Sequence, residues 1–184
     1  VADRFVGAMR ELTAKLKVGD PTQRDTAVGP MARGNLRDEL HGQVQRTVQA
    51  GAQLLMGGKP MDGPGYFYEP TILDHVTPDM PAAKEETFGP AAAVIRVKDA
   101  DEAVRLANAT EFGLGAALWT TDLERAKVLA RRIEAGAVFI NGLVASDARL
   151  PFGGIKQSGY GRELGEFGIR EFTNIKTVWI GPAR

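Results

Sequence analysis

The sequence contains no cysteine, and this absence removes several kinds of chemistry from the chain. Without a thiol there is no disulfide, no cysteine-ligated zinc and no thiol nucleophile among these residues. Histidine is scarce as well, because His41 and His75 are the only two and they stand far apart without metal-ligand spacing. We interpret both histidines as structural or surface residues, and we expect no metal site.

The sequence also lacks a charge imbalance and any long apolar run. Lys plus Arg and Asp plus Glu number 23 each, so the formal net charge is zero and does not favour a nucleic-acid partner. No apolar run approaches the length of a membrane span, and the first residues alternate charged and apolar side chains, unlike a signal peptide. We therefore expect a cytoplasmic protein that binds neither nucleic acid nor a membrane.

What the sequence does contain is an ordinary globular composition, with 184 residues of which 43% are hydrophobic. A chain of this length can bury a substantial core without covalent cross-links. Apolar residues spaced three and four apart predict amphipathic helices over 2–16 and 36–48. Since the first helix begins at Val1 with no residue before it to cap its amides, we expect that an N-terminal piece is missing.

Residues 91–141 carry the clearest alternation of strands and helices. Asp99 with Glu102 three residues later forms a capping-box pattern, and Thr121 with Glu124 repeats it, so each pair predicts a helix start. Short apolar runs between these helices predict strands over 91–97, 115–120 and 137–141. This β-α-β-α-β order with short connections predicts a parallel sheet covered by helices, and hence an α/β fold.

The remaining segments are less regular. A short strand is expected near 52–58, and residues 66–73 read as a strand that Pro70 places at a sheet edge or a bulge. A glycine-rich loop follows Asn141, with one short helix near 162–167. Residues 173–180 predict a final strand.

General motifs for phosphate binding or nucleophilic catalysis are incomplete. The stretches GLGAAL and GYGREL lack the third glycine of a dinucleotide fingerprint, and no phosphate loop is present. Ser158 has no histidine in the C-terminal half to activate it. Glu85 and Glu86 are adjacent, and neighbouring residues in an extended chain point to opposite sides, so they would not share one substrate proton. From spacing alone, we therefore predict only that one of these two carboxylates faces a pocket.

Four longer motifs together carry a family resemblance. KEETFGP (84–90), EFGLGAALWTTD (111–122), GAVFINGLVASDARLPFGG (136–154) and PFGGIKQSGYGREL (151–164) resemble the aldehyde dehydrogenase superfamily in the order of that family. The INGLVASDARLPFGG loop and the NIKTVW ending are most similar to its succinate-semialdehyde branch. The resemblance implies that this chain is the C-terminal part of such an enzyme, less than half of it.

The resemblance also implies which parts of the chemistry this chain would lack. Enzymes of this family form a thiohemiacetal on a cysteine, pass hydride to NAD+ or NADP+, and hydrolyse the resulting thioester with a glutamate base. In the family the cysteine, that glutamate and the nucleotide-binding domain lie upstream of the matched region. We therefore expect no catalytic residue in this chain and no activity from it alone, whereas the full-length enzyme would oxidise an aldehyde, succinate semialdehyde in this branch, with NAD or NADP.

Four residues of this chain acquire binding roles through the resemblance, and Arg149 is added to them from its position in the sequence alone. Glu86 would accept hydrogen bonds from the nicotinamide ribose, and Phe88 would pack against the nicotinamide ring. Phe152 would line the aldehyde tunnel, and Ser146 would present a hydroxyl to the distal carboxylate of the substrate. Arg149 is a nearby cation that could assist Ser146, although it also reads as an ordinary surface arginine.

The resemblance further predicts the organisation and assembly of the chain. Residues 1–150 would form an N-terminally truncated α/β catalytic domain, and residues 151–184 the active-site loop and an oligomerisation strand. We expect a homo-oligomer, a dimer or a tetramer. The alternative is a non-catalytic remnant or interaction module that keeps only the oligomerisation surface. The coding sequence upstream of Val1 would discriminate between the two, through a cysteine-bearing segment and a dinucleotide-binding domain.

Overall fold

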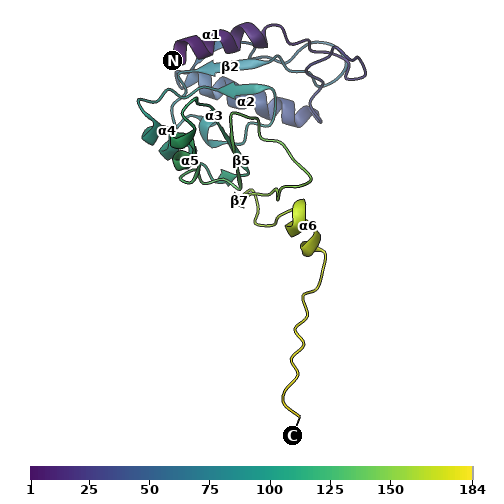
Figure 1. Ribbon diagram of the computed structural model, residues 1–184. Helices are drawn as coiled ribbons and strands as arrows, with labels where there is room; N and C mark the ends of the chain where they lie inside the picture. Colours follow the sequence, from purple (N-terminus) through teal and green to yellow (C-terminus); the bar gives the residue numbers. More distant parts are fainter. Residues whose placement is uncertain (184) are drawn as a thin grey trace. The chain divides into compact units, whose positions relative to one another are not determined.

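The chain divides into two compact units in a computed structural model that describes residues 1–183. The first unit is Val1–Lys98 and the second begins at Asp99, so the division predicted at residue 150 lies within the second unit. Helices and strands alternate in both units (Figure 1). The α/β fold class is therefore confirmed.

The first unit contains a three-stranded sheet between helices. Its elements in chain order are α1 (Ala2–Thr13), α2 (Gly34–Gln49), β1 (Gln53–Met56), β2 (Thr71–Asp74), α3 (Pro81–Lys84) and β3 (Ala91–Ala93). The strand order is β1-β2-β3, with β1 antiparallel and β3 parallel to β2. All four residues of β2 are buried, because it is the central strand and helices α1 and α2 lie on its opposite sides (Figure 1).

Pro70 predicted a sheet edge or a bulge for the strand over 66–73, and the central position of β2 shows that the edge is wrong. The strand begins directly after Pro70, so the missing amide of proline lies outside the ladder and does not force β2 to an edge. Tyr68 instead makes an isolated antiparallel bridge to Pro60. Burial raises the pKa of the Tyr68 hydroxyl to about 12, and this hydroxyl lies 3.1 Å from Nδ1 of His41. His41 is thus a partner of a core tyrosine.

The face of β2 that points toward α2 forms the main core. The apolar stripe predicted for the second helix faces this core, and two of its residues, Leu40 and Val44, are each only 1% exposed. They pack with five further buried residues, Ala52, Tyr68, Leu73, Val76 and Met80. Burial of these side chains removes apolar surface from water, which is the dominant favourable term in folding. Helix α2 is therefore a fixed support for whatever contacts its remaining surface.

The other side of β2 is connected to α1 through one arginine. The Arg96 guanidinium donates to both carboxylate oxygens of Asp74, at 3.0 and 2.8 Å, and to Oδ1 of Asp3 at 2.6 Å. Asp74 is buried, and the hydrogen bonds from Arg96 hold its pKa below the ordinary value. The apolar stripe of α1 is mostly exposed within residues 1–183, since only Val6 of this helix is buried.

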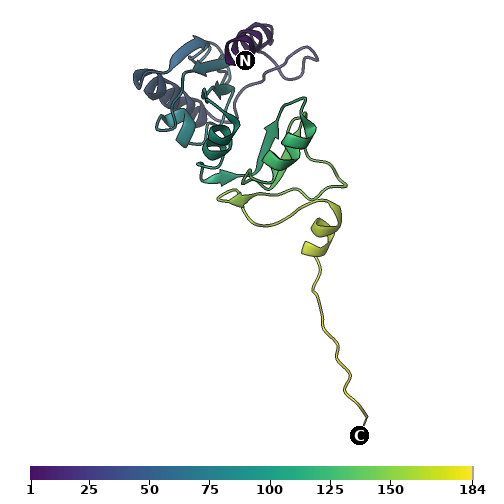
Figure 2. The ribbon, with the colours of Figure 1, turned by 60° about the vertical axis from the view of Figure 1, so that its left-hand side comes forward.

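Within residues 99–183 the second unit contains one parallel strand pair, one antiparallel strand pair and three helices. Its elements are α4 (Ala100–Ala107), β4 (Phe112–Gly113), β5 (Gly115–Leu118), α5 (Leu123–Ala130), β6 (Ala137–Ile140), β7 (Ile155–Lys156) and α6 (Gly165–Glu171). Strands β5 and β6 are parallel in register from Gly115↔Ala137 to Leu118↔Ile140, and α5 packs against β6 (Figure 2). Strands β4 and β7 form an antiparallel pair.

The three strands predicted over 91–141 therefore do not share one ladder. Strand β3 is hydrogen-bonded to β2, and β5 is hydrogen-bonded to β6. The Asp99 cap is confirmed, because its carboxylate accepts from the Glu102 amide at 2.8 Å. The second cap lies one residue later than predicted: Asp122, not Thr121, accepts from the amide three residues on.

Residues 173–180, predicted as an oligomerisation strand, are unpaired here, and their pairing with another subunit stays a prediction. Within residues 1–183 this segment pairs with no strand, and Figure 1 shows it as an extended single chain after α6. A strand exists only when its backbone groups find a partner, so the β-rich composition alone does not produce one.

None of the helices in residues 1–183 combines the length and the apolarity that crossing a membrane requires.

Candidate functional site: a braced loop and a glycine-walled cavity

The segment that carries Glu86 is held against one face of α2. Thr47 is fully buried, donates its hydroxyl to the Gln43 carbonyl at 2.7 Å and accepts from the Ala82 amide at 3.0 Å. Gln43 Nε2 donates to the main-chain carbonyl of Glu86 at 2.9 Å. Residues three and four apart on a helix share a face, so these two side chains hold successive points of the segment.

The two adjacent glutamates are used differently. Glu85 Oε2 accepts from Arg46 Nη2 at 2.6 Å, in an ion pair to the next turn of α2. The carboxylate of Glu86 has no hydrogen-bond or ion-pair partner among residues 1–183, although its main-chain carbonyl is bound. One carboxylate of the pair is thus occupied by the protein, and the other is available for a ligand.

Phe88 and the Gly89–Pro90 corner complete this loop. The Phe88 ring is 63% exposed. Behind it the backbone approaches α2 so closely that a Cβ on Gly89 would lie 2.6 Å from Leu40 Cδ2. A larger residue at this position would displace the Leu40 side chain. Pro90 leads directly into β3, and its carbonyl accepts from the Thr71 amide at 2.8 Å.

In the second unit the PFGG segment forms the wall of a cavity of about 360 Å³. Phe152 is half-buried in this wall, and its backbone pairs with Glu163 through hydrogen bonds of 2.7 and 2.8 Å. Glycines make up much of the wall, which is lined by Leu114, Phe152, Gly153, Gly154, Ser158, Gly159, Tyr160, Gly161, Arg162, Glu163, Glu171 and Phe172. The cavity joins an apolar ring to a few polar groups, as small-molecule sites do.

The other two residues assigned to the substrate lie on the loop before this segment. Ser146 is exposed, with no hydrogen-bond partner among residues 1–183, and it does not line the cavity. Arg149 is exposed too, but its Nε and Nη2 donate to the two carboxylate oxygens of Asp147 at 2.9 and 2.6 Å. This pairing lowers the pKa of Asp147 and raises that of Arg149, so the arginine charge is already balanced locally.

Polar residues of the PFGG block that carry no predicted role hold the loop in place. Lys156 Nζ donates to the Asn108 carbonyl at 2.8 Å and lies 2.8 Å from Glu134 Oε2. Ser158 Oγ accepts from the Gly113 amide at 3.0 Å, which assigns a structural contact to this serine. Arg162 Nη1 donates to the carbonyls of Gly154 and Gly161. These three side chains thus fix the backbone of the segment that follows Phe152.

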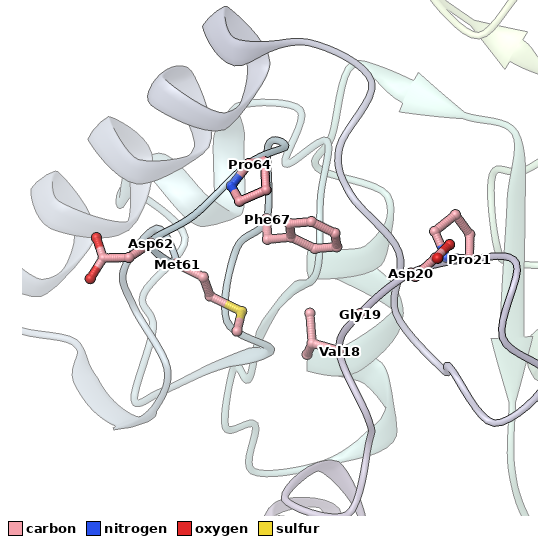
Figure 3. A pocket seen from close by; sticks show the side chains of 8 residues that line it. All are labelled: Val18, Gly19, Asp20, Pro21, Met61, Asp62, Pro64 and Phe67. Atoms are coloured by element: carbon pink, nitrogen blue, oxygen red, sulfur yellow. The ribbon is translucent and has the colours of Figure 1, made fainter.

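A larger cavity, of about 490 Å³, lies in the first unit between two loops. Its centre is apolar, with Val18, Met61 and Phe67 facing one another (Figure 3). Asp20 lies on its border, but that carboxylate accepts from the amide and hydroxyl of Thr22 at 2.9 Å each. None of the residues predicted for cofactor or substrate lines this cavity.

Glu86 thus presents an unpaired carboxylate, and Phe88 an exposed ring, on a loop that hydrogen bonds hold to α2. The model of the aldehyde dehydrogenase family matches residues 1–178 of this chain. The chain therefore belongs to the aldehyde dehydrogenase family, which confirms the resemblance found in its motifs.

Individual relatives agree with this family. The chain is 56% identical over 177 residues to the succinate semialdehyde dehydrogenase (NAD(P)+) of Escherichia coli (strain K12), and the match covers 96% of this chain and 37% of that protein. It is 52% identical to the succinate-semialdehyde dehydrogenase (NADP(+)) 1 of Mycobacterium ulcerans (strain Agy99), covering 98% of this chain and 40% of that protein. The chain thus spans about two fifths of the length of these relatives.

Solved structures of aldehyde dehydrogenases also superimpose on this chain. The succinic semialdehyde dehydrogenase from Streptococcus pyogenes in complex with NADP+ superimposes with a TM-score of 0.93 at 37% identity, over 98% of this chain and 40% of that one. The NAD-dependent aldehyde dehydrogenase from Sinorhizobium meliloti superimposes with a TM-score of 0.95 at 41% identity, over 100% of this chain and 37% of that one.

Proposed function

We propose that this chain is the C-terminal portion of an NAD(P)-dependent aldehyde dehydrogenase that oxidises succinate semialdehyde to the carboxylic acid. The single observation that carries the proposal is the Glu86–Phe88 loop, with its unpaired carboxylate and exposed ring, in a chain of this family. The relatives named for succinate semialdehyde support the choice of substrate.

The residues of this loop fit the nicotinamide end of the cofactor. A carboxylate can accept hydrogen bonds from both vicinal hydroxyls of a ribose, and such charge-assisted bonds are stronger than neutral ones. The Phe88 ring can pack against the nicotinamide. The bound cofactor would supply the hydride acceptor, and Glu86 and Phe88 would fix where that acceptor lies. The relatives, which are named for NAD(P)+ and for NADP+, support NAD or NADP as the cofactor.

Phe152 and Ser146 are proposed to bind the aldehyde, and Arg149 is a weaker candidate. The apolar wall around Phe152 would exclude water from the reacting centre. Ser146 Oγ has no partner within residues 1–183, so it is free to donate to a substrate carboxylate. The bidentate pair with Asp147 leaves little uncompensated charge on Arg149, which favours Ser146 as the principal contact.

The substrate assignment predicts a selective effect of Ser146→Ala in the intact enzyme. Loss of one hydrogen bond to a charged group should raise KM for succinate semialdehyde about tenfold. Steady-state kinetics with butanal, which has the same chain length but no distal carboxylate, provides the control and should show an unchanged KM. An equal rise for both aldehydes, or no rise for either, would remove Ser146 from recognition of the substrate carboxylate.

We also propose that the enzyme is a homo-oligomer and that residues 173–180 pair with another subunit. The segment is apolar and unpaired within residues 1–183, with Ile175 91% and Trp179 82% exposed. Exposed apolar area and open backbone groups on this scale are normally covered by a partner.

This proposal predicts a dimer or tetramer in sedimentation, with the amides of 173–180 protected from hydrogen exchange. The variant Ile175→Lys should weaken the assembly and increase exchange in that segment, because it puts a charge into an apolar contact. The unmodified enzyme at the same concentration is the reference. A monodisperse monomer that still protects 173–180 would contradict the proposal, since the segment would then fold back on its own subunit.

A further inference from the structure

Gln43 fixes the residue to which the cofactor role is assigned. Its Nε2 donates to the Glu86 main-chain carbonyl at 2.9 Å, so the bond holds the backbone from which the free carboxylate projects. Gln43 itself stands on α2 next to Val44, which is 1% exposed and part of the main core. The side chain therefore connects the Glu86 backbone to a helix whose apolar face is part of the main core.

The neighbouring contacts keep the loop attached when Gln43 is changed. Thr47 holds the Ala82 amide, Arg46 holds Glu85, and Leu40 packs behind Gly89. The Arg46–Glu85 pair has side chains 51% and 43% exposed, and pairs of this kind contribute little to stability. Its effect is local, because it neutralises Glu85 and leaves Glu86 as the unpaired charge. Removing Gln43 should thus loosen one point of the loop and spare the fold.

We infer that Gln43 is a positioning residue for the nicotinamide ribose, acting through the main chain of Glu86. The inference rests on the proposed cofactor role of Glu86. A ribose held by one carboxylate needs the Cα of that residue in a fixed place, because an error of an ångström at the reacting atoms is costly. Without Gln43 the Glu86 backbone can move between its anchors at Glu85 and Gly89, and the carboxylate moves with it.

The test uses Gln43→Met and Gln43→Glu in the intact enzyme. The first keeps the length of the side chain and removes the donor, and the second is isosteric but presents an acceptor to the carbonyl. Gln45→Met is the matched control, since Gln45 lies on the same helix, is exposed and has no partner within residues 1–183. Three quantities are measured: the cofactor dissociation constant by fluorescence titration, hydrogen exchange of residues 85–89 without cofactor, and the thermal midpoint.

Both Gln43 variants should weaken NAD(P)+ binding by about three- to tenfold, the range that one hydrogen bond supports. Exchange of the 85–89 amides should increase, while KM for the aldehyde and the thermal midpoint stay as in the unmodified enzyme. Gln45→Met should change none of these quantities. A lower thermal midpoint with equal losses of cofactor and aldehyde affinity would overturn the inference, because it would show general loosening.

A double-mutant cycle separates this inference from the proposed function. If Glu86→Gln weakens cofactor binding and Gln43→Met does not, the inference is wrong and the role of Glu86 stands. If both weaken binding and their effects combine less than additively, Gln43 acts through Glu86 as inferred. Full additivity would mean that Gln43 reaches the cofactor by another route, which contradicts the inference. If Glu86→Gln has no effect, the cofactor role of Glu86 and the inference fail together.

Discussion

The purified 184-residue chain should not oxidise succinate semialdehyde with either NAD+ or NADP+. The reason is the sequence itself, which contains no cysteine and therefore no thiolate to attack the aldehyde. Ser158, the serine among the glycines, already accepts a hydrogen bond from the Gly113 amide and has no histidine near it in sequence. The expected effect is complete loss, since no other residue of the chain offers an activated nucleophile for this reaction.

The measurement is the formation of reduced nicotinamide, followed by absorbance over hours at high protein concentration. The intact enzyme assayed in parallel supplies the reference rate, and a mock purification from the same host supplies the background. A rate above that background, proportional to the amount of chain and unaffected by thiol-modifying reagents, would show that the chain catalyses the oxidation without a cysteine.

The sequence predicts best those features that depend on short-range rules. The Asp99 cap and the buried stripe of α2 were both expected, because capping and helical periodicity involve residues only a few positions apart. The second cap was misplaced by one residue because Thr121 and Asp122 are both good capping residues and only the backbone geometry selects Asp122. Local signals thus gave the elements but not every boundary.

Features that depend on pairing between distant segments were predicted less well. Nothing in residues 66–73 indicates that β2 is the central strand, since that depends on β1 and β3 reaching it from both sides. The segment 173–180 has the composition of a strand but finds no ladder partner within residues 1–183. Propensity describes a residue on a pleated surface, and the surface itself is supplied by other parts of a fold.

The residues of the candidate site also differ in whether a local sequence signal indicates them. The cofactor roles of Glu86 and Phe88 were predicted from the resemblance of the KEETFGP motif and stay a proposal. The different contacts of Glu85 agree with the expectation that adjacent carboxylates point apart. Gln43 was not found, because a glutamine on an amphipathic helix carries no local signal of its contact 43 residues away. Braces of this kind are visible only once the backbone of the loop has been placed beside the helix.

Replacing Glu86 with glutamine in the intact enzyme should slow hydride transfer by roughly ten- to a hundredfold, the cost of a small misplacement of reacting groups. Glutamine keeps the size of the side chain and can still accept through one oxygen, but it loses the charge that strengthens both bonds to the ribose. The loop should stay in place, because the contact from Gln43 is made to the main chain of residue 86.

Glu11→Gln is the matched control, because it makes the same change of charge at an exposed glutamate of α1 in the same unit. Its single-turnover rate should equal that of the unmodified enzyme. A slower rate in this control would indicate an effect of net charge, which the Glu86 result would then have to exceed.

The decisive measurement is therefore single-turnover hydride transfer in the Glu86→Gln enzyme at saturating cofactor, compared with deuterated and undeuterated aldehyde. We predict a slower transfer step with a larger expressed isotope effect, since the chemical step becomes more limiting when the nicotinamide is less well placed. An unchanged rate and isotope effect at saturation would contradict the assignment of this loop as the support of the nicotinamide ribose.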